Sequence, residues 1–330
     1  MFFTQKNNNL HGKSVINYVL RRIPAILALL VLLIGETQAQ YDPSFSHYWA
    51  MPTVYNPAAV GKQEKLNIVG AYNMSMTGFE NNPRTMVAAA DMPFQFMDAY
   101  HGVGGKFLND QIGLFSHNSF ALQYALKIKL FSGMLGIGVQ AAMLSENFDG
   151  SKVETAKEND PAFATSELTG SGFDLGAGIY YSTKSWYAGA SVAHALAPTI
   201  ELGEKNELVI DRTYYLMAGG NIRLKNPLFT IHPSLLGRTD GVGYRADATV
   251  RMKYTHDKKV MYAGVGYSPG NSVTVYLGGN FHGISLGYSY EAYTNGISLG
   301  NGSHELVVTY QTDMNLTKKG RNRHQSVRIL

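Results

Sequence analysis

The 330-residue sequence contains no cysteine. This absence excludes disulfide bonds, thiolate metal sites and a lipid anchor on an N-terminal cysteine. Apart from one short run near the N-terminus, no stretch approaches the roughly eighteen apolar residues of a transmembrane helix. The ten histidines are scattered, without a His-x-x-x-His pair, so we expect no metal site and no cofactor. Helical periodicity is almost absent, which favours an all-β class.

The one apolar run has the form of an export signal. Arg21 and Arg22 precede the twelve uncharged residues Ile23–Ile34, and small residues lead up to Ala39. Twelve residues make only about 18 Å of helix, too short for a bilayer core of about 30 Å. A basic flank, a short apolar core and small residues predict a signal peptide, 1–39, that is cleaved after Ala39.

Side chains alternate between apolar and polar along many short segments after the signal. In 119–130, SFALQYALKIKL, Phe120, Leu122 and Ile128 fall on one face, and Gln123 and Lys127 fall on the other. Because side chains in a strand have a period of two, this pattern predicts a strand with one apolar and one polar face. About fourteen such segments follow one another: 66–76, 84–92, 102–108, 118–130, 134–144, 172–182, 186–194, 212–224, 228–236, 244–254, 260–268, 272–281, 284–292 and 303–313.

The connections between these segments separate a soluble β protein from a membrane barrel. Several are two to five residues long, whereas 145–171 and 195–211 are long. Short and long connections alternate in outer-membrane barrels, which have short periplasmic turns and longer outer loops. Two connections depart from this rule: 93–101 is long for a turn, and 268–271 is short for an outer loop. We therefore predict an all-β transmembrane antiparallel β-barrel of the outer-membrane type, with a secreted soluble β protein as an alternative.

The charges of the predicted strand 244–254 fall on its polar face. In 244–254, Arg245, Asp247, Arg251 and Lys253 alternate with apolar residues. A charge on the lipid side would cost about 2–4 kcal/mol near the midplane, so this face should line the interior. Tyrosines near strand ends, including Tyr276, suit the membrane interface or are simply good strand formers.

Two sequences resemble catalytic or nucleotide-binding motifs. Residues 266–270 read G-x-S-x-G, but Pro269 and the strand that follows indicate a hairpin turn rather than a nucleophile elbow. Gly136 and Gly138 imitate a dinucleotide fingerprint, yet no helix follows them, and we expect these glycines to make room in the lumen. We predict that the protein is not an enzyme.

The segment 40–62 fits no strand. It carries five aromatic residues, and Pro43, Pro52 and Pro57 interrupt any regular strand. So many aromatic side chains are unfavourable in water. We therefore expect this segment, within an N-terminal region of 40–65, to pack inside the barrel mouth or against a partner.

The order of motifs resembles one known family. Q-x-D-P-x-F-S at 40–46 and Y-x-N-P-A-x-x-G from Tyr55 are followed by GVGGKFLNDQIG at 102–113 and DPAF at 160–163. This order is similar to that of the PorP/SprF family, outer-membrane proteins of the type IX secretion system of Bacteroidetes. A Q-W pair that the family usually carries after the first strand is replaced here by NMSMTGFENN.

The resemblance implies a function and partners. It implies a non-enzymatic outer-membrane protein that helps to export or anchor cell-surface proteins, such as adhesins, sometimes linked to gliding motility. The implied partners are a periplasmic lipoprotein ring, other secretion components and the C-terminal domain of the cargo. On this view the outer loops, especially 145–171, hold cargo, and the segment 42–61 meets the ring. An ordinary porin or small-solute transporter is the alternative that the same barrel allows.

Charge is concentrated at the C-terminus. Removing residues 1–39 lowers the net charge from +4 to +1, and the tail 315–330 carries five basic residues and no acid. This tail is either solvated or a docking strip in the periplasm, and export excludes nucleic acid as a partner. The residues predicted to form partner interfaces are Asp42, Pro43, Phe45, Tyr55, Asn56, Pro57, Asp160, Pro161, Phe163, Lys318, Lys319, Arg321 and Arg323.

Overall fold

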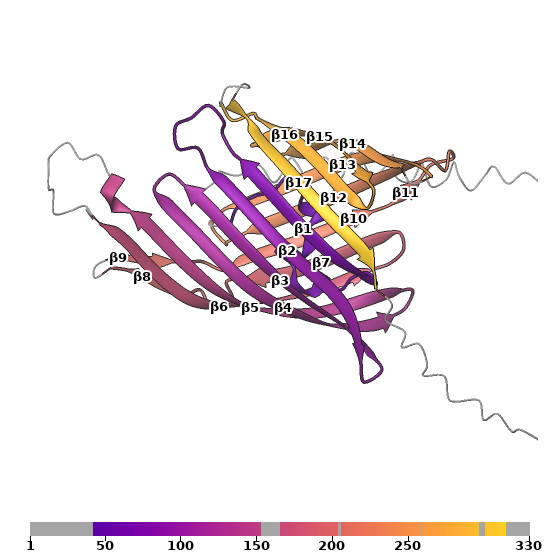
Figure 1. The fold of residues 1–330 in the computed structure, drawn as a ribbon, viewed down its shortest axis with the longest axis horizontal. Coiled ribbons are helices and arrows are strands. Elements are labelled where there is room, and N and C mark those ends of the chain that lie inside the picture. Colours follow the sequence, from indigo (N-terminus) through magenta and orange to yellow (C-terminus); the bar gives the residue numbers. More distant parts are fainter. Residues whose placement is uncertain (1–41, 153–165, 204–205, 258, 297–300, 315–330) are drawn as a thin grey trace, which may run out of the picture.

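The computed structural model describes residues 42–152, 166–203, 206–257, 259–296 and 301–314. In these residues fourteen antiparallel strands form a closed barrel, which confirms the predicted fold class (Figure 1). Pairing of β10 with β12 completes the closure. The barrel strands are β1 (Lys65–Met74), β2 (Arg84–Phe96), β3 (Ala99–Ile112), β4 (Phe115–Leu130), β5 (Gly133–Asp149), β6 (Glu167–Ser182), β7 (Trp186–Ala193), β10 (Thr213–Gly220), β12 (Phe229–Thr239), β13 (Tyr244–His256), β14 (Lys259–Ser268), β15 (Ser272–Phe281), β16 (Ile284–Tyr293) and β17 (Ser303–Asp313).

The helices of the described residues are all short. Three of them, η1 (Tyr48–Ala50), α2 (Pro52–Tyr55) and η2 (Pro57–Ala59), precede the first strand, and η3 (Gly150–Lys152) follows β5. No helix in this part of the chain is long and apolar enough to cross a membrane.

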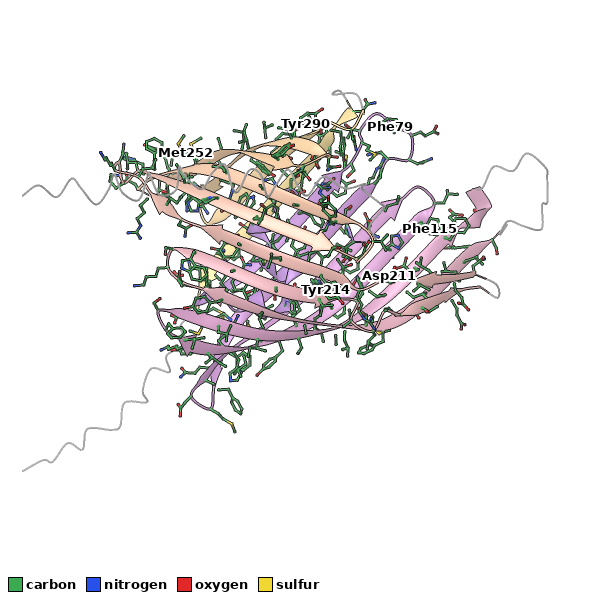
Figure 2. The ribbon with its side chains drawn as sticks, turned by 180° about the vertical axis from the view of Figure 1, so that it is seen from behind. Phe79, Phe115, Asp211, Tyr214, Met252 and Tyr290 are labelled. Atoms are coloured by element: carbon green, nitrogen blue, oxygen red, sulfur yellow. The ribbon has the colours of Figure 1, made fainter. Side chains whose placement is uncertain are left out.

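The two ends of the barrel differ in their connections. At the end where β1 begins and β17 ends, which we call the turn end, most connections are tight. At the opposite loop end, longer connections occupy 75–83, 150–166, 194–212 and 294–302. Figure 2 shows Phe79, Phe115 and Tyr290 toward the loop end and Met252 toward the turn end.

Several strands are longer than the sequence predicts. β2 and β3 continue through 93–101 and leave only Met97 and Asp98 between them, so the long turn expected there does not exist. β5 and β6 pair as far as Asp149 and Glu167, so the predicted loop 145–171 narrows to 150–166. The alternation of connections is weaker than expected, because three loop-end connections, 113–114, 240–243 and 269–271, are short. The hairpin at 266–270 is confirmed, with the Asn271 amide donating to the Ser268 carbonyl.

The loop end carries a small hairpin of its own. β8 (Thr199–Leu202) and β9 (Asn206–Val209) lie in the connection after β7, and a two-residue strand, β11 (Ile222–Arg223), pairs with β12 at the turn end. Ile200 is fully buried in a cluster with Ala142 and Leu144, whose side chains face the lumen from β5. The hairpin therefore covers part of the lumen mouth beside β5 and β6.

The predicted faces of the strands are confirmed. On β4, Leu122 is 60% exposed on the outer surface, whereas Gln123 is 2% exposed and faces inward. On β13, Val250 and Met252 are exposed and Arg251 borders a lumenal cavity. An apolar outside and a polar inside are what a lipid-solvated barrel requires. Tyr276 does not lie at the membrane interface, where tyrosines near strand ends are expected, because its ring is buried in the lumen.

Candidate functional site: an N-terminal plug in the lumen

Residues 42–61 run through the inside of the barrel, and we call this segment the plug (Figure 1). Pro52 and Pro57 each stand in the first turn of a short helix, where the missing amide proton costs nothing. Asn56 caps η2, since its side-chain oxygen accepts from the amide of Ala58 at 2.9 Å. The prolines that rule out a strand therefore also build the compact coil that fits a barrel interior.

The first residue of the plug lies at the loop end, in a charged cluster. His194 Nε2 lies 3.0 Å from Asp42 Oδ1, and Tyr215 donates to the other carboxylate oxygen. Arg238 donates from Nη1 to the Asp42 carbonyl at 2.7 Å. The second nitrogen of His194 lies 3.0 Å from Asp174 on β6. This set of contacts, the Asp42 cluster, ties the start of the plug to β6, β10, β12 and the end of β7.

In the Asp42 cluster, His194 and Asp42 stabilise each other's charged forms. Burial opposes the charged form of His194, but Asp42 and Asp174 outweigh it and raise the pKa of His194 to about 9. Burial also opposes the Asp42 carboxylate, yet His194 and Tyr215 hold its pKa well below the usual range. Both groups are therefore charged at neutral pH.

A second cluster holds the plug four residues further on. Glu305 on β17 accepts the backbone amides of Ser46 and His47 at 2.7 and 2.8 Å. The same carboxylate lies 2.7 Å from His47 Nδ1 and accepts from Asn73 on β1. The Glu305 side chain is 1% exposed, so its charge is satisfied entirely by the plug and the neighbouring strand.

The middle of the plug touches the wall at β13 and β14. The Tyr48 hydroxyl donates to the Asp247 carbonyl and lies 3.0 Å from Thr249 Oγ1 on β13. The Arg251 guanidinium lies 3.5 Å above the Trp49 ring, whose edge also meets Tyr262. These contacts reach β13 and β14, so the plug is bound on both sides of the lumen.

Wall lysines and an asparagine of the plug satisfy main-chain groups along the second half of the plug. Lys106 and Lys127 donate to the carbonyls of Val54 and Ala58, both at 2.7 Å. Asn56 donates to the Ile179 carbonyl at 2.9 Å. Since a coil without a partner strand leaves carbonyls unpaired, these inward-facing polar side chains take the place of a sheet neighbour.

Glycines in the wall allow the plug to approach closely. A Cβ at Gly138 on β5 would lie 2.4 Å from the Ala58 nitrogen, and one at Gly102 on β3 would lie 2.1 Å from the Val60 carbonyl oxygen. Any larger residue at either position would displace the plug backbone. The expectation that Gly136 and Gly138 make room in the lumen is confirmed, since Gly136 faces the Ala58 carbonyl in the same way.

The plug does not fill the lumen completely. A cavity of about 310 Å³ remains beside it in the half near the turn end, bordered by Trp49, Lys62, Arg251 and Lys253. A smaller one of about 50 Å³ lies beside the Asp42 cluster. In the described residues no group of three or more His, Asp or Glu side chains is placed to hold a metal ion.

The structure brings six of the predicted interface residues together inside the lumen. Phe45, Tyr55 and Asn56 are buried there, Asn56 at 0% exposure, so their side chains contact the barrel wall. Asp42, Pro43 and Pro57 belong to the same plug and complete the six. The other seven, Asp160, Pro161, Phe163, Lys318, Lys319, Arg321 and Arg323, lie outside the described residues.

Sequence reasoning missed the wall residues that hold the plug, notably Glu305, His194 and Lys127. Their only signal is that they are charged or polar at inward-facing positions or at the end of a strand. That signal also fits a water-filled pore.

Comparison with known proteins places the chain in a family. A family model described as "Type IX secretion system membrane protein PorP/SprF" matches residues 37–310. None of the curated proteins compared with the chain matches it. Among solved structures, the chain is similar to the CymD monoaromatic hydrocarbon channel at 12% identity and a TM-score of 0.48, covering 81% of this chain and 94% of that one. It is similar at the same identity and TM-score to a FadL homologue of Pseudomonas aeruginosa, covering 85% and 96%. At these TM-scores nothing is inferred from either likeness. The family match covers most of the sequence, and the chain therefore belongs to the PorP/SprF family of type IX secretion system membrane proteins.

Proposed function

We propose that this outer-membrane protein helps to export or anchor cell-surface proteins through the type IX secretion system, in concert with a periplasmic lipoprotein ring. The observation that carries the proposal is the plug. Its side chains are buried, and it is bonded to β17, β13 and β6 at separate points along its length. A barrel occupied in this way is suited to presenting its two ends to partners rather than to bulk diffusion.

The ends have different partners in this proposal. The longer connections at the loop end correspond to the cell surface in outer-membrane barrels, and short turns correspond to the periplasm. Cargo would then be held at the loop end, where the β8–β9 hairpin and Phe79 are placed. The ring would meet the turn end, together with the basic tail.

The plug supports this function over the porin alternative. A porin needs a continuous water path, whereas here the plug backbone accepts hydrogen bonds from Lys106 and Lys127 and donates to Glu305. The charged inner faces that fit a wet pore are in large part used to hold the plug.

Conductance in planar bilayers tests the closed state. We expect the wild-type barrel to pass no steady porin-sized current, and an in-frame deletion of 42–61 to open one. Heat-modifiable gel mobility shows whether the deletion variant still folds as a barrel. A large, steady conductance of the wild type would contradict the proposal and favour a diffusion channel.

Cell-surface proteomics tests the secretion role itself. Deleting the whole gene should remove one or a few surface proteins, and restoring the wild type should return them. The ring lipoprotein should co-purify with the wild type and be recovered less with a variant in which Lys318, Lys319, Arg321 and Arg323 are Gln. Unchanged surface proteins after deletion would exclude an export role.

A further inference from the structure

The cavity beside the plug, here named the turn-end cavity, has an unusual balance of charge. Its border includes Lys62, Lys65, Arg251 and Lys253 but only one acid, Asp91. Asp91 already accepts from the amide of Gly61 and from Asn67. Lys65 is paired with Asp313 at the barrel rim, 3.4 Å away. Lys62 donates to the Tyr180 hydroxyl at 3.4 Å and lies over the Tyr187 ring. The other two cations, Arg251 and Lys253, lie on the inner face of β13.

Arg251 and Lys253 differ from the other inward-facing cations described above. Arg245 is paired with Asp247 and Glu291, at 2.9 and 3.0 Å. Lys106, Lys127 and Arg238 each donate to a plug carbonyl. Within the part of the chain that the structure describes, neither Arg251 nor Lys253 pairs with a carboxylate or donates to a protein acceptor.

The strand register gathers these cations. Arg251 and Lys253 are two residues apart on one face of β13, and His232 on β12 stands directly opposite Arg251. Arg251 Nε and His232 Nε2 are buried and have no hydrogen-bond partner among the described residues. Two adjacent cations repel each other, and burial increases that repulsion, so an anion between them would be stabilised.

The rest of the border is suited to the body of a small molecule. Pro52 and Val307 supply apolar surface, and Tyr262 and Trp49 supply aromatic surface. A volume of about 310 Å³ is at the lower end of the range of about 300–1,000 Å³ for small-molecule sites. Guanidinium groups bind carboxylates and phosphates through paired N–H donors.

We propose that the turn-end cavity is a binding site for a small anion that carries a carboxylate or phosphate group, held by Arg251 and Lys253. The site is independent of the secretion role, since it rests only on the cavity and its charges. Because Arg251 is stacked on Trp49, the bound anion sits against the plug.

Tryptophan fluorescence provides a direct test. The chain has two tryptophans, Trp49 in the cavity and Trp186 on the outer surface of β7. In a Trp186→Phe barrel the signal comes from Trp49 alone. Sodium phosphate and sodium butyrate are titrated separately, against sodium chloride at matched ionic strength. We expect a saturable change with at least one of them; which one saturates identifies phosphate or carboxylate as the preferred group.

Matched variants in the same background assign the site. Arg251→Gln should raise the Kd roughly tenfold or more, about 1.4 kcal/mol, and Lys253→Gln should also raise it. Lys129→Gln changes an exposed lysine at the turn end of β4 and should leave the Kd unchanged. Heat-modifiable gel mobility checks that each variant folds as a barrel. If Arg251→Gln does not fold, the Kd of Lys253→Gln tests the proposal. A response equal to that of chloride, or an unchanged Kd in the cavity variants, would overturn the proposal.

Discussion

Glu305 Oε1 lies 2.7 Å from Nδ1 of His47 and also accepts the backbone amide of His47, so one buried carboxylate on β17 fixes both the chain and the side chain of the plug. Removing the charge leaves two plug amides with a weaker acceptor. Because hydrogen bonds to a charged group contribute about 1.5–3 kcal/mol each, Glu305→Gln should loosen the loop-end half of the plug substantially.

Hydrogen–deuterium exchange measures this loosening. In Glu305→Gln, amides of 42–51 should exchange faster by at least roughly tenfold, equivalent to about 1.4 kcal/mol, while amides of the strands remain protected. Glu207→Gln, which neutralises an exposed acid on β9, is the matched control. Equal exchange of 42–51 in Glu305→Gln and in the control would show that Glu305 does not hold the plug.

Gly138 gives a second test of plug packing. An alanine there would place its Cβ 2.4 Å from the Ala58 nitrogen, so either the plug or β5 must shift. Overpacking of this kind costs about 1–3 kcal/mol. The temperature at which the heat-modifiable band converts should fall in Gly138→Ala. Gly70→Ala is the control, because its nearest neighbouring atom is 3.9 Å away, and it should unfold at the wild-type temperature or slightly above.

The strands were predictable because lipid outside and a polar lumen inside impose a period of two on every one of them. All fourteen predicted segments coincide with barrel strands. Their ends were not predictable from hydrophobicity, as 145–149 and 167–171 show. Both segments are mainly polar, but backbone pairing continues beyond the apolar band, as between Ser145 and Ser171.

The plug was predictable only as a segment that must be buried. Its position depends on contacts between residues far apart in sequence, such as Lys127 with the Ala58 carbonyl, which lie 69 residues apart. A main-chain acceptor leaves no trace in the sequence. The inward-facing charges therefore fit a wet pore as well as a plugged one, and only the fold distinguishes the two.

Leu122 tests which face of the barrel meets lipid. It lies near the middle of β4 and points outward, so Leu122→Lys places a charge near the bilayer midplane. We expect the free energy of unfolding in lipid bilayers to fall by about 2–4 kcal/mol. Leu130→Lys introduces the same residue on the same strand and face, but at the turn end. That variant should lose only about 0–1 kcal/mol, and equal losses would contradict a lipid-facing midplane at Leu122.

The Asp42 cluster should make the start of the plug sensitive to alkaline pH. The pKa of His194 is raised from 6.5 to about 9. The stability that the charged His194 gives to the bound plug is therefore fully present below pH 6.5 and is lost as the pH rises through 9. The pKa of Asp42 is depressed, so its contribution is present above 3.8 and is lost only in strong acid. The contact between Asp42 and His194 should therefore persist at pH 7. By pH 10 its stabilising free energy should fall by on the order of 2 kcal/mol.

Bilayer recordings at both pH values can detect this weakening as more frequent channel openings at pH 10. Lys106 also borders the cluster, so His194→Gln is the necessary control. A neutral amide at 194 removes the charge at every pH. The variant should open more often than the wild type at pH 7 and change little between pH 7 and 10. If the variant instead showed the full wild-type response to alkali, the pH sensitivity would reside in Lys106 or another group, and His194 would only position Asp42.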